Sequence, residues 1–347
     1  MTTDVSLGRQ TTCEVSMIVA IRNEEGFIEK CLESLLCQDI PQDSYEIIVI
    51  DGMSTDKTPQ IIDRYRNQYP EIVKVFTNPE RIQTIGWNIG IRHSCGEFIQ
   101  IIGGHSYLES NYVRILLESL KNSGSEVAGI GGIHVPPNNE DYLGKVIGNV
   151  QGSLLGGAGT SFRSPKFLKA ADTVVFPVYK RKVLDTVGLY DERFDIAEDV
   201  ELNWRIRKAG FKLLVCPRAV AYYYRKHSTF VLFFKRMIRY GVWRARVMKK
   251  HPSSFKPLFL IPILLSIAPL LLTVFLIAST FLAESILLGL IIYLLAVLIS
   301  STWLSIQKRH YKYMISVIFY VLEHFGIGVG FMAGLLKKFP TSRTNLK

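Results

Sequence analysis

The sequence predicts an α/β domain with a mostly parallel, doubly wound sheet, followed by a basic amphipathic helix and apolar membrane helices. Two observations support this fold class. Short β-rich runs alternate with stretches of helical spacing up to about residue 225, and the composition then becomes almost wholly apolar. We therefore divide the 347-residue chain into residues 1–225, 226–256 and 257–347.

The alternating part of the chain predicts the order of its strands and helices. Strands are expected at 15–21, 45–50, 72–76, 98–102 and 127–135, and helices at 27–36, 59–69, 82–93 and 108–120. Strands joined through helices run parallel, so polar loops at their carboxyl ends should carry the chemistry. Two glycine-rich loops are expected at 136–144 and 156–165, and the second is a candidate lid over a ligand.

Three apolar stretches follow the α/β domain. Leu258–Thr280 and Ser285–Ile306 are each long enough to cross a bilayer as a helix. Lysine and arginine flank both stretches, which places the flanks and the first domain in the cytoplasm of a multi-pass cell-membrane protein. Met314–Leu336, with Glu323 and His324 in its middle, is expected to span as well. Alternatively it is re-entrant or interfacial, with those two side chains solvated.

The basic charge favours a membrane surface over nucleic acid. The formal net charge is +11, but the basic residues concentrate in Arg225–Lys256, beside the first apolar stretch. There they would meet anionic headgroups, and the mixture of aromatic and basic residues at 228–250 is typical of an interfacial helix. The five cysteines form no CxxC pair, so we expect reduced thiols and no zinc site.

Carboxylates stand where the predicted strands end. Glu24 follows the first strand and Asp51 ends the second, and such groups can accept hydrogen bonds from a ribose or a base. Asp56 is expected only to cap a helix or shape a turn. The pair Glu198-Asp199 is a candidate general base facing a bound nucleotide, although two acids at a helix start can also serve only its dipole. The sequence contains neither GxGxxG nor a P-loop motif, which argues against dinucleotide enzymes and P-loop nucleotidases.

These motifs together resemble the family 2 glycosyltransferases of the GT-A fold. The resemblance rests on IVAIRNE at 18–24, VIDGMSTD at 49–56, GWNIGI at 86–91 and Gly96-Glu97, and on Glu198-Asp199 with Asn203, Arg205 and Gly210. It is strongest to the succinoglycan-type bacterial membrane glucosyltransferases, through Gly159 with Arg163, DTV at 172–174 and Tyr240-Gly241.

The resemblance implies an inverting transfer from a nucleotide-diphosphate sugar. Asp199 would be the base, with Glu198 beside it shaping the site. The residues implied in donor binding are Ala20, Glu24, Asp51, Arg81, Asn88 and Gly103. Those implied for the acceptor or the lid are Gly159, Arg163, Asp172 and Arg239.

The chain departs from the family at the metal site. An Asp-x-Asp or Asp-x-His motif after the fourth strand normally holds a divalent cation, but this segment is Ile102-Gly103-Gly104-His105. His105 alone remains as a ligand, which suits manganese better than magnesium. The alternatives are that Arg81, Arg163 or Arg239 neutralises the leaving group, or that the enzyme is weakened or inactive.

The expected acceptor is membrane-associated. The Gln-x-x-Arg-Trp motif of polymer-extruding synthases is absent, and RMIRY at 236–240 resembles it only loosely. Too few spans are present to enclose a channel, so we expect transfer of one sugar to a lipid-linked saccharide. The alternatives are a polyprenyl-phosphate sugar synthase and a non-catalytic scaffold that binds nucleotide sugars.

Overall fold

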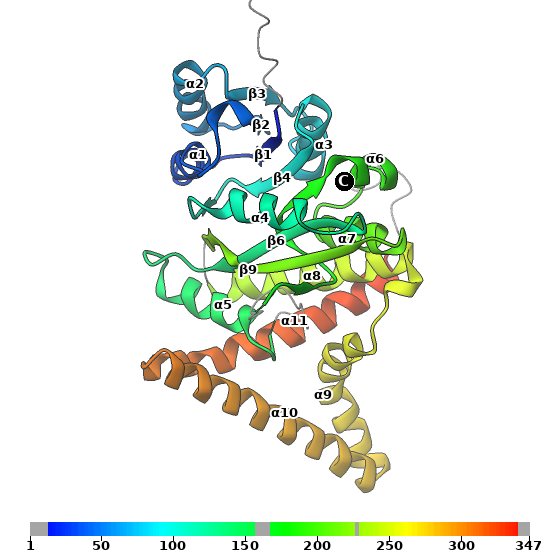
Figure 1. Cartoon of the computed structure of the whole chain (residues 1–347). Helices are drawn as coiled ribbons and strands as arrows, with labels where there is room; N and C mark the ends of the chain where they lie inside the picture. Colours follow the sequence, from blue (N-terminus) through cyan, green and yellow to red (C-terminus); the bar gives the residue numbers. More distant parts are fainter. Residues whose placement is uncertain (1–12, 157–166, 226–228, 339–347) are drawn as a thin grey trace, which may run out of the picture.

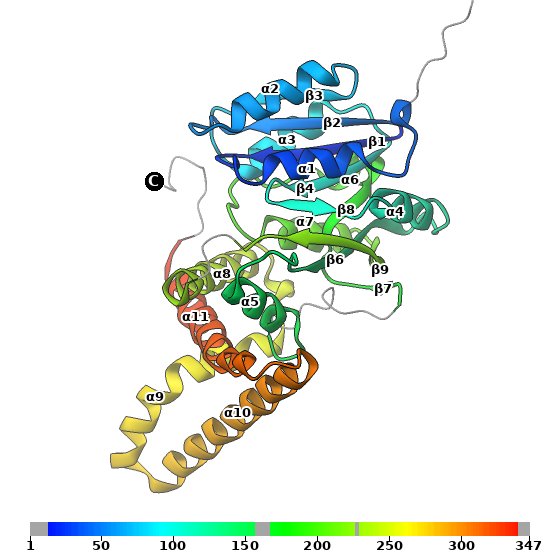
Figure 2. The ribbon, with the colours of Figure 1, turned by 90° about the vertical axis from the view of Figure 1, so that its left-hand side faces the viewer.

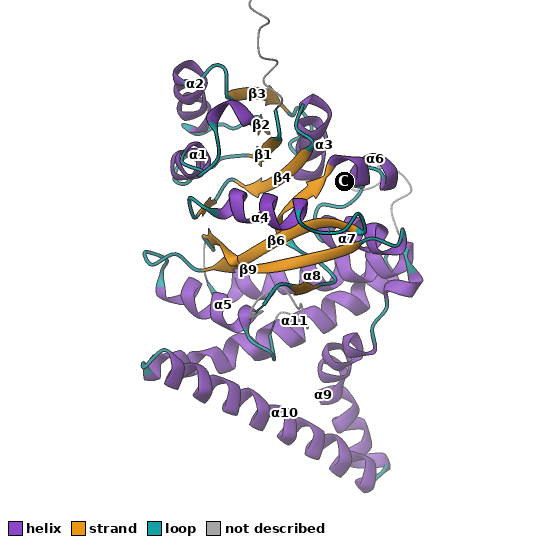
Figure 3. Ribbon diagram, in the orientation of Figure 1, coloured by secondary structure: helices purple, strands orange, loops and turns teal. Residues whose placement is uncertain are grey.

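A mixed sheet with helices on both faces sits above a group of long helices (Figures 1 and 3). The computed structural model describes residues 13–156, 167–225 and 229–338. The strands are β1 Val15–Ile21, β2 Tyr45–Asp51, β3 Val73–Thr77, β4 Phe98–Gly103, β5 Ser106–Leu108, β6 Val127–Val135, β7 Lys169–Ala170, β8 Val175–Lys180 and β9 Lys212–Tyr223. The helices are α1 Ile28–Leu36, α2 Thr58–Gln68, α3 Gln83–His93, α4 Tyr112–Lys121, α5 Tyr142–Gly152, α6 Arg181–Val187, α7 Glu198–Lys208, α8 Phe230–Lys250, α9 Leu260–Ala278, α10 Thr280–Gln307 and α11 Ser316–Leu336.

The sheet brings the expected polar strand ends together. Its order is β3-β2-β1-β4-β8-β6-β9-β5, with β7 on β9. The strands β3, β2, β1 and β4 are parallel, and Ile21 pairs with Asp51 while Ala20 pairs with Gly103. The doubly wound parallel prediction is confirmed for this half. Strand β8 enters antiparallel between β4 and β6, so the complete sheet is mixed.

The period of two along the central strands explains the two helical layers. Odd-numbered residues of β1, such as Met17 and Val19, pack on α1, α2 and α4, while Ile18 and Ala20 face α3, α6 and α7. Helix α3 can lie close because it presents glycine. A Cβ on Gly90 would come within 2.4 Å of the Ile18 side chain. The GWNIGI motif is thus partly a packing motif.

Two predicted boundaries are wrong. The helix expected from residue 108 begins at Tyr112, because Ser106–Leu108 pairs as β5 with β9. The loop expected at 136–144 ends early, because the Asp141 carboxylate accepts a hydrogen bond from the Gly144 amide at 2.6 Å and caps α5. Both errors have the same reason: hydrophobic spacing reveals neither a side-chain cap at a helix start nor the pairing of a short strand.

Among the residues that the structure describes, three helical segments are long and apolar enough to cross a membrane: Pro257–Ala278, Thr280–Gln307 and Tyr311–Leu336. In the most apolar part of the first two segments, 6% and 11% of the residues are buried inside the protein, compared with 56% in the third segment. The first two helices, α9 and α10, form a hairpin joined at Ser279 that projects below the domain (Figures 1 and 2). Helix α11 instead lies against α8 under the domain.

The glycine-rich part of α11 forms the contact with α8. Glycines 326, 330 and 334 face Met237, Ile238 and Val242 of α8 in succession, so the two helices run parallel. A Cβ on Gly330 would lie 2.0 Å from the carbonyl oxygen of Ile238. Such spacing of small residues lets helix backbones approach closely in membranes.

Gly330→Ala is therefore expected to destabilise the α8–α11 pair by about 3 kcal/mol, since the backbone of Ile238 cannot yield as a side chain can. Thermal unfolding of the detergent-purified protein measures the effect. Gly289→Ala in α10 is the matched control, because a Cβ there meets nothing within 4 Å. Equal unfolding temperatures for the two variants would contradict the packing assignment.

The polar pair inside α11 is buried rather than solvated, so the solvated alternative is wrong. Glu323 is 1% exposed and His324 is 6% exposed. The His324 ring lies 2.9 Å from the Tyr293 hydroxyl on α10 and 3.0 Å from the carbonyl oxygen of Leu155. His324 thus joins the apolar helices to the sheet domain through the chain that follows α5.

Candidate active site

The loops that follow β1, β2 and β3 meet at one edge of the sheet. A Cβ on Gly52 would lie 3.0 Å from the Ile21 carbonyl oxygen and 3.6 Å from Cα of Arg81. Asp51 is held there because its carboxylate accepts hydrogen bonds from the amide and the hydroxyl of Ser54, at 3.2 and 2.5 Å. The structure thus places Asp51 in the same group of loops as exposed Arg81, and donor binding by either residue stays a prediction.

Asp56 has the local role expected from the sequence. Its carboxylate accepts hydrogen bonds from the amides of Thr58, at 3.0 Å, and Glu25, at 3.1 Å. These bonds cap α2 and tie its start to the loop after β1. Although burial opposes ionisation, hydrogen bonds from the side chain and amide of Thr58 and from the Glu25 amide hold the pKa of Asp56 below its ordinary value.

Glu24 contacts His105 directly. The Glu24 carboxylate is buried and lies 3.1 Å from Nδ1 of His105. A carboxylate at Nδ1 favours the tautomer that carries a proton there and leaves Nε2 with its lone pair. Glu24, which the resemblance implied in donor binding, is therefore placed to orient the one expected metal ligand.

Gly103, at the position where the family has an acid, lies beside an aromatic ring. A Cβ at this position would lie 3.4 Å from the Phe176 ring of β8. The neighbouring Gly104 packs so tightly that its Cβ would meet Ile21 at 2.3 Å. The aromatic ring of Phe176 thus occupies the space beside the position where the family has a carboxylate.

Three aromatic residues around His105 are missing from the sequence predictions. Tyr223 at the end of β9 packs edge-on against His105, with ring centroids 4.8 Å apart, and stacks on His134 at 5.3 Å. Phe176 lies 4.2 Å from His134. Burial raises the pKa of Tyr223 to about 12. The run of tyrosines at 222–224, at the end of a strand, was the available signal.

Two residues implied in donor binding have structural tasks. Ala20 is buried in β1, where a Cβ on Gly86 would lie 2.9 Å from its methyl group. The buried Asn88 amide donates to the Tyr190 carbonyl oxygen at 2.9 Å and accepts from the Tyr190 amide at 3.0 Å. Asn88 thus holds the segment that precedes the acid pair, and donor contact by either residue stays a prediction.

The acid pair begins α7, as expected. Ala197 before it has φ +62°, a left-handed conformation that is uncommon for a residue with a side chain. The Asp199 carboxylate accepts a hydrogen bond from the Val200 amide at 2.7 Å. Strained backbone conformations of this kind are typical of functional sites. The one at Ala197 indicates that the orientation of the acid pair is set specifically.

Buried hydroxyl groups lie behind the acid pair. The Tyr179 hydroxyl donates to the Asn203 side chain at 2.7 Å, and Tyr190 is hydrogen-bonded to Tyr179. Burial, and then the charge of Asp199, raises the pKa of Tyr179. These hydroxyls stay protonated, so the polar surroundings of the pair are fixed.

The two acids of the pair are electrostatically coupled. Burial and the adjacent Asp199 carboxylate raise the pKa of Glu198 well above its usual range. Two adjacent carboxylates cannot easily both carry a charge, so an ionised Asp199 favours the protonated form of Glu198. This division of roles suits one base and one neutral partner.

The residues implied for the acceptor are only partly placed. Gly159 and Arg163 lie outside the described residues. Asp172 forms ion pairs with Arg207, at 3.1 Å, and with Lys256. Arg239 is exposed on α8, whereas Arg236, one turn earlier, lies close enough to Tyr223 to lower its pKa against the effect of burial.

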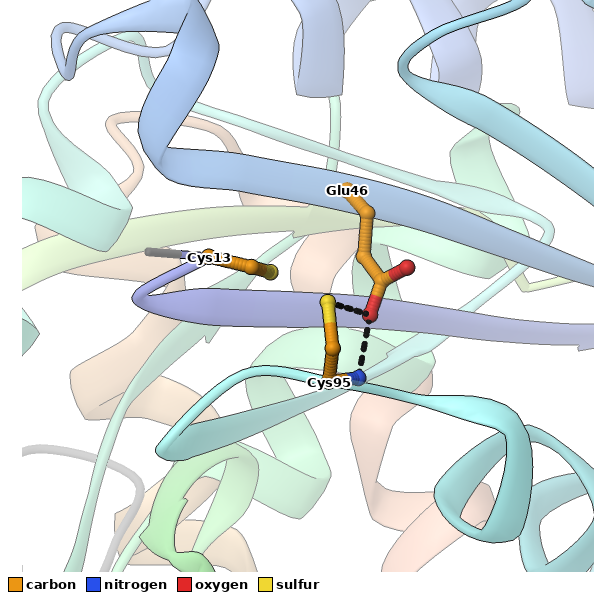
Figure 4. A group of neighbouring side chains, drawn as sticks. All are labelled: Cys13, Glu46 and Cys95. Carbon is orange, nitrogen blue, oxygen red and sulfur yellow. Dashed lines mark hydrogen bonds between the residues drawn. The ribbon is translucent and has the colours of Figure 1, made fainter. Parts of the chain in front are cut away.

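One group of side chains with metal-ligand spacing occurs among the described residues, and it lies at the opposite edge of the sheet: Cys13, Glu46 and Cys95 (Figure 4). Glu46 already accepts hydrogen bonds from Ser16 at 2.6 Å, from the Cys95 amide at 2.7 Å and from Lys74 at 2.7 Å. Burial raises the pKa of Cys95 to about 12. A saturated carboxylate and protonated thiols indicate a structural cluster.

The similarity of the chain to known proteins identifies it as a glycosyltransferase. Residues 16–187 match the family model described as Glycosyl transferase family 2, and residues 177–345 match Glycosyl transferase family 21. The chain belongs to the family 2 glycosyltransferases, as the resemblance predicted.

Two curated proteins are similar along most of their length. One, from Methanococcus voltae, is a dolichyl N-acetyl-alpha-D-glucosaminyl phosphate 3-beta-D-2,3-diacetamido-2,3-dideoxy-beta-D-glucuronosyltransferase. It is 32% identical over 93% of this chain and 97% of its own. The succinoglycan biosynthesis protein ExoA of Rhizobium meliloti (strain 1021) is 25% identical over 70% of this chain and 72% of its own.

The fold also matches a solved structure that extends past the sheet domain. The mannosyltransferase PcManGT of Pyrobaculum calidifontis, in complex with GDP-Man and Mn²⁺, superposes with a TM-score of 0.60 and 19% identity. The match covers 91% of this chain and 87% of that one. The predicted GT-A-type architecture with its helical extension is thus confirmed.

Proposed function

We propose that this enzyme transfers one sugar, with inversion, from a nucleotide-diphosphate sugar to a lipid-linked saccharide at the cytoplasmic face of a membrane. The observation that carries the proposal is the contact between the acid-pair loop and α8. The Phe194 ring lies 5.6 Å from Trp243 of α8, and Val247 completes this buried cluster. The loop that leads into the candidate base therefore packs on a basic helix next to the apolar hairpin.

The position of α8 supports a site at the headgroups. Its exposed side includes Val231 and Leu232, and its sequence carries lysine and arginine throughout. So many charges are costly in hydrocarbon but favourable among anionic headgroups. Helix α11 runs along α8, which supports the interfacial alternative for α11 and keeps Lys337 and Lys338 on the cytoplasmic side. The α9–α10 hairpin then provides the membrane anchor.

The proposed step needs one base. Asp199 takes the proton of the acceptor hydroxyl, and the oxygen attacks the anomeric carbon as the bond to the diphosphate breaks on the opposite face. The bonding electrons leave with the diphosphate, so the configuration inverts. Glu198 stays neutral beside the base. Asp51 and Arg81 lie at the strand ends where the nucleotide would be held.

His105 fits a divalent cation of the manganese type. Its Nδ1 faces Glu24, which leaves Nε2 as the donor atom, and the diphosphate oxygens would complete the ligand set. A bound cation would neutralise charge on the leaving diphosphate. Glu24 and His105 are the residues that would hold it.

A lipid-linked saccharide is preferred over a bare lipid phosphate as the acceptor. The relative from Methanococcus voltae carries a dolichyl N-acetylglucosaminyl phosphate in its name and matches nearly end to end. That correspondence includes the apolar helices, which would hold an acceptor of similar build.

Transfer assays test the function. The full chain in liposomes is incubated with Mn²⁺, native lipid extract and radiolabelled UDP-glucose, UDP-N-acetylglucosamine or GDP-mannose. We expect label in the organic phase, mass spectrometry showing one sugar added to a lipid that already carries one, and an inverted anomeric centre by NMR. One sugar on a bare lipid phosphate would indicate the synthase alternative. Neither transfer nor hydrolysis with any donor would indicate a scaffold.

A further inference from the structure

The segment that joins α8 to the first apolar helix contacts α7 directly through Lys250 and His251, and indirectly through Lys256. Lys250 at the end of α8 lies 2.6 Å from both Glu201 and Asp191. His251 lies 2.9 Å from Glu201, and its ring stacks on Trp204 with centroids 3.9 Å apart. We call these contacts of Lys250 and His251, together with the ion pair of Lys256, the linker clasp.

The third contact lies on the other side of α7. Lys256, just before the apolar stretch, pairs with Asp172, which also pairs with Arg207 of α7 at 3.1 Å. The next residue, Thr173, accepts a hydrogen bond from Asn203 of α7 at 2.7 Å. The chain entering the membrane thus holds α7 from both sides.

The buried centre of the linker clasp is Glu201, three residues after Glu198. It is 0% exposed, and Arg205 binds it through two nitrogens at 2.9 and 3.0 Å. Although burial opposes ionisation, Arg205, Lys250 and His251 hold the pKa of Glu201 below its ordinary value. A buried carboxylate that is bonded to several cationic groups can adopt few geometries. A displacement of its partners is therefore passed on to the helix that carries it.

The opposite face of α7 completes the constraint. Leu202 and Ile206 are fully buried against the sheet. The helix therefore cannot shift without breaking either its apolar packing or the linker clasp. Its first turn carries the acid pair, so the position of Asp199 follows that of α7.

We infer that the linker clasp positions the acid pair relative to the membrane, with Lys250, His251 and Lys256 acting as positioning residues for the transfer. The inference rests on the proposed function, because the distance of the base from the bilayer matters only if the acceptor is in it. It adds a direct mechanical link between the membrane anchor and the base.

Hydrogen exchange of the full chain in nanodiscs of phosphatidylglycerol and phosphatidylcholine tests the link without any substrate. Lys250→Met should raise amide exchange in α7 at least about tenfold and leave α3 unchanged. Lys250→Arg, which can still bridge Glu201 and Asp191, should restore protection. Lys308→Met is the control, since it removes a basic residue beside the apolar helices but outside the linker clasp.

The second arm measures transfer from labelled donor into the native lipid extract. Lys250→Met should lower kcat about tenfold or more with the donor KM within twofold, because the strand-end loops are untouched. Lys256→Met, at a half-exposed ion pair, keeps the test valid if the buried variant does not fold.

Unchanged α7 exchange in both methionine variants would overturn the inference, as would equal effects in Lys308→Met. Failure of the wild type to use any donor would instead refute the proposed function and leave the exchange result standing.

Discussion

Replacing Asp199 by asparagine is expected to lower kcat for sugar transfer by about 10²- to 10⁴-fold, the usual contribution of a general base. Asparagine keeps the size of the side chain and can still accept the hydrogen bond from the Val200 amide. It cannot take a proton at neutral pH. The donor KM should therefore stay within a few-fold, and steady-state kinetics with the lipid extract separates the two effects.

Glu198→Gln is the matched control for that result. Because burial and Asp199 raise the pKa of Glu198, the wild-type side chain is already neutral near its usual titration range, and glutamine copies that state. We expect kcat within about fivefold of the wild type and an unchanged acid limb of the pH–rate profile.

The raised pKa of Glu198 also means that this group lowers the stability of the folded protein at neutral pH. A carboxyl that binds its proton more tightly in the folded state costs stability once the pH exceeds the unfolded value, about 4.3. This cost grows until the pH reaches the folded value. Glu198→Gln should therefore raise the unfolding temperature at pH 7 and have little effect at pH 4. A loss of activity as large as that of Asp199→Asn would show that Glu198 shares the role of base.

Local sequence patterns predicted most of the parallel half of the sheet and the carboxylates at its strand ends. The buried runs of β1 and β2 predict central strands, and Asp51 and Glu24 follow from their positions at the ends of those runs. Parallel pairing then brings these ends together without further information, as the register of Ile21 with Asp51 shows. The positions of these strands and their parallel pairing were predicted correctly because hydrophobic periodicity and strand direction determine them.

The missed features depend on contacts between distant parts of the chain. Phe176 reaches Gly103 only because β8 inserts beside β4, and nothing local to either residue signals that neighbour. The contact of Asn88 with Tyr190, 102 positions away, is likewise absent from the sequence predictions, while its role in donor binding stays a prediction. His324 is expected to be solvated in the interfacial alternative, but the structure gives it partners on α10 and at Leu155. Side chains that join distant segments and those that bind ligands look alike in sequence.

The second large effect is expected at His105. His105→Ala, or removal of divalent ions with EDTA, should weaken binding of UDP or GDP by about 10- to 100-fold, measured by isothermal titration calorimetry in Mn²⁺ buffer. Mn²⁺ should support tighter binding than Mg²⁺, since an imidazole with few carboxylates suits the softer ion. Asp199→Asn serves as the control, because it leaves the strand-end loops intact.

Glu24 offers a graded test of the same site. Glu24→Gln can still accept a hydrogen bond from Nδ1 of His105, so it should weaken nucleotide binding less than Glu24→Ala. Equal losses in both variants would mean that charge, rather than orientation of His105, matters. If neither EDTA nor His105→Ala changes binding while Arg81→Ala does, an arginine neutralises the diphosphate. The arginine would then take the place of the cation that the family normally binds through an acid at the position of Gly103.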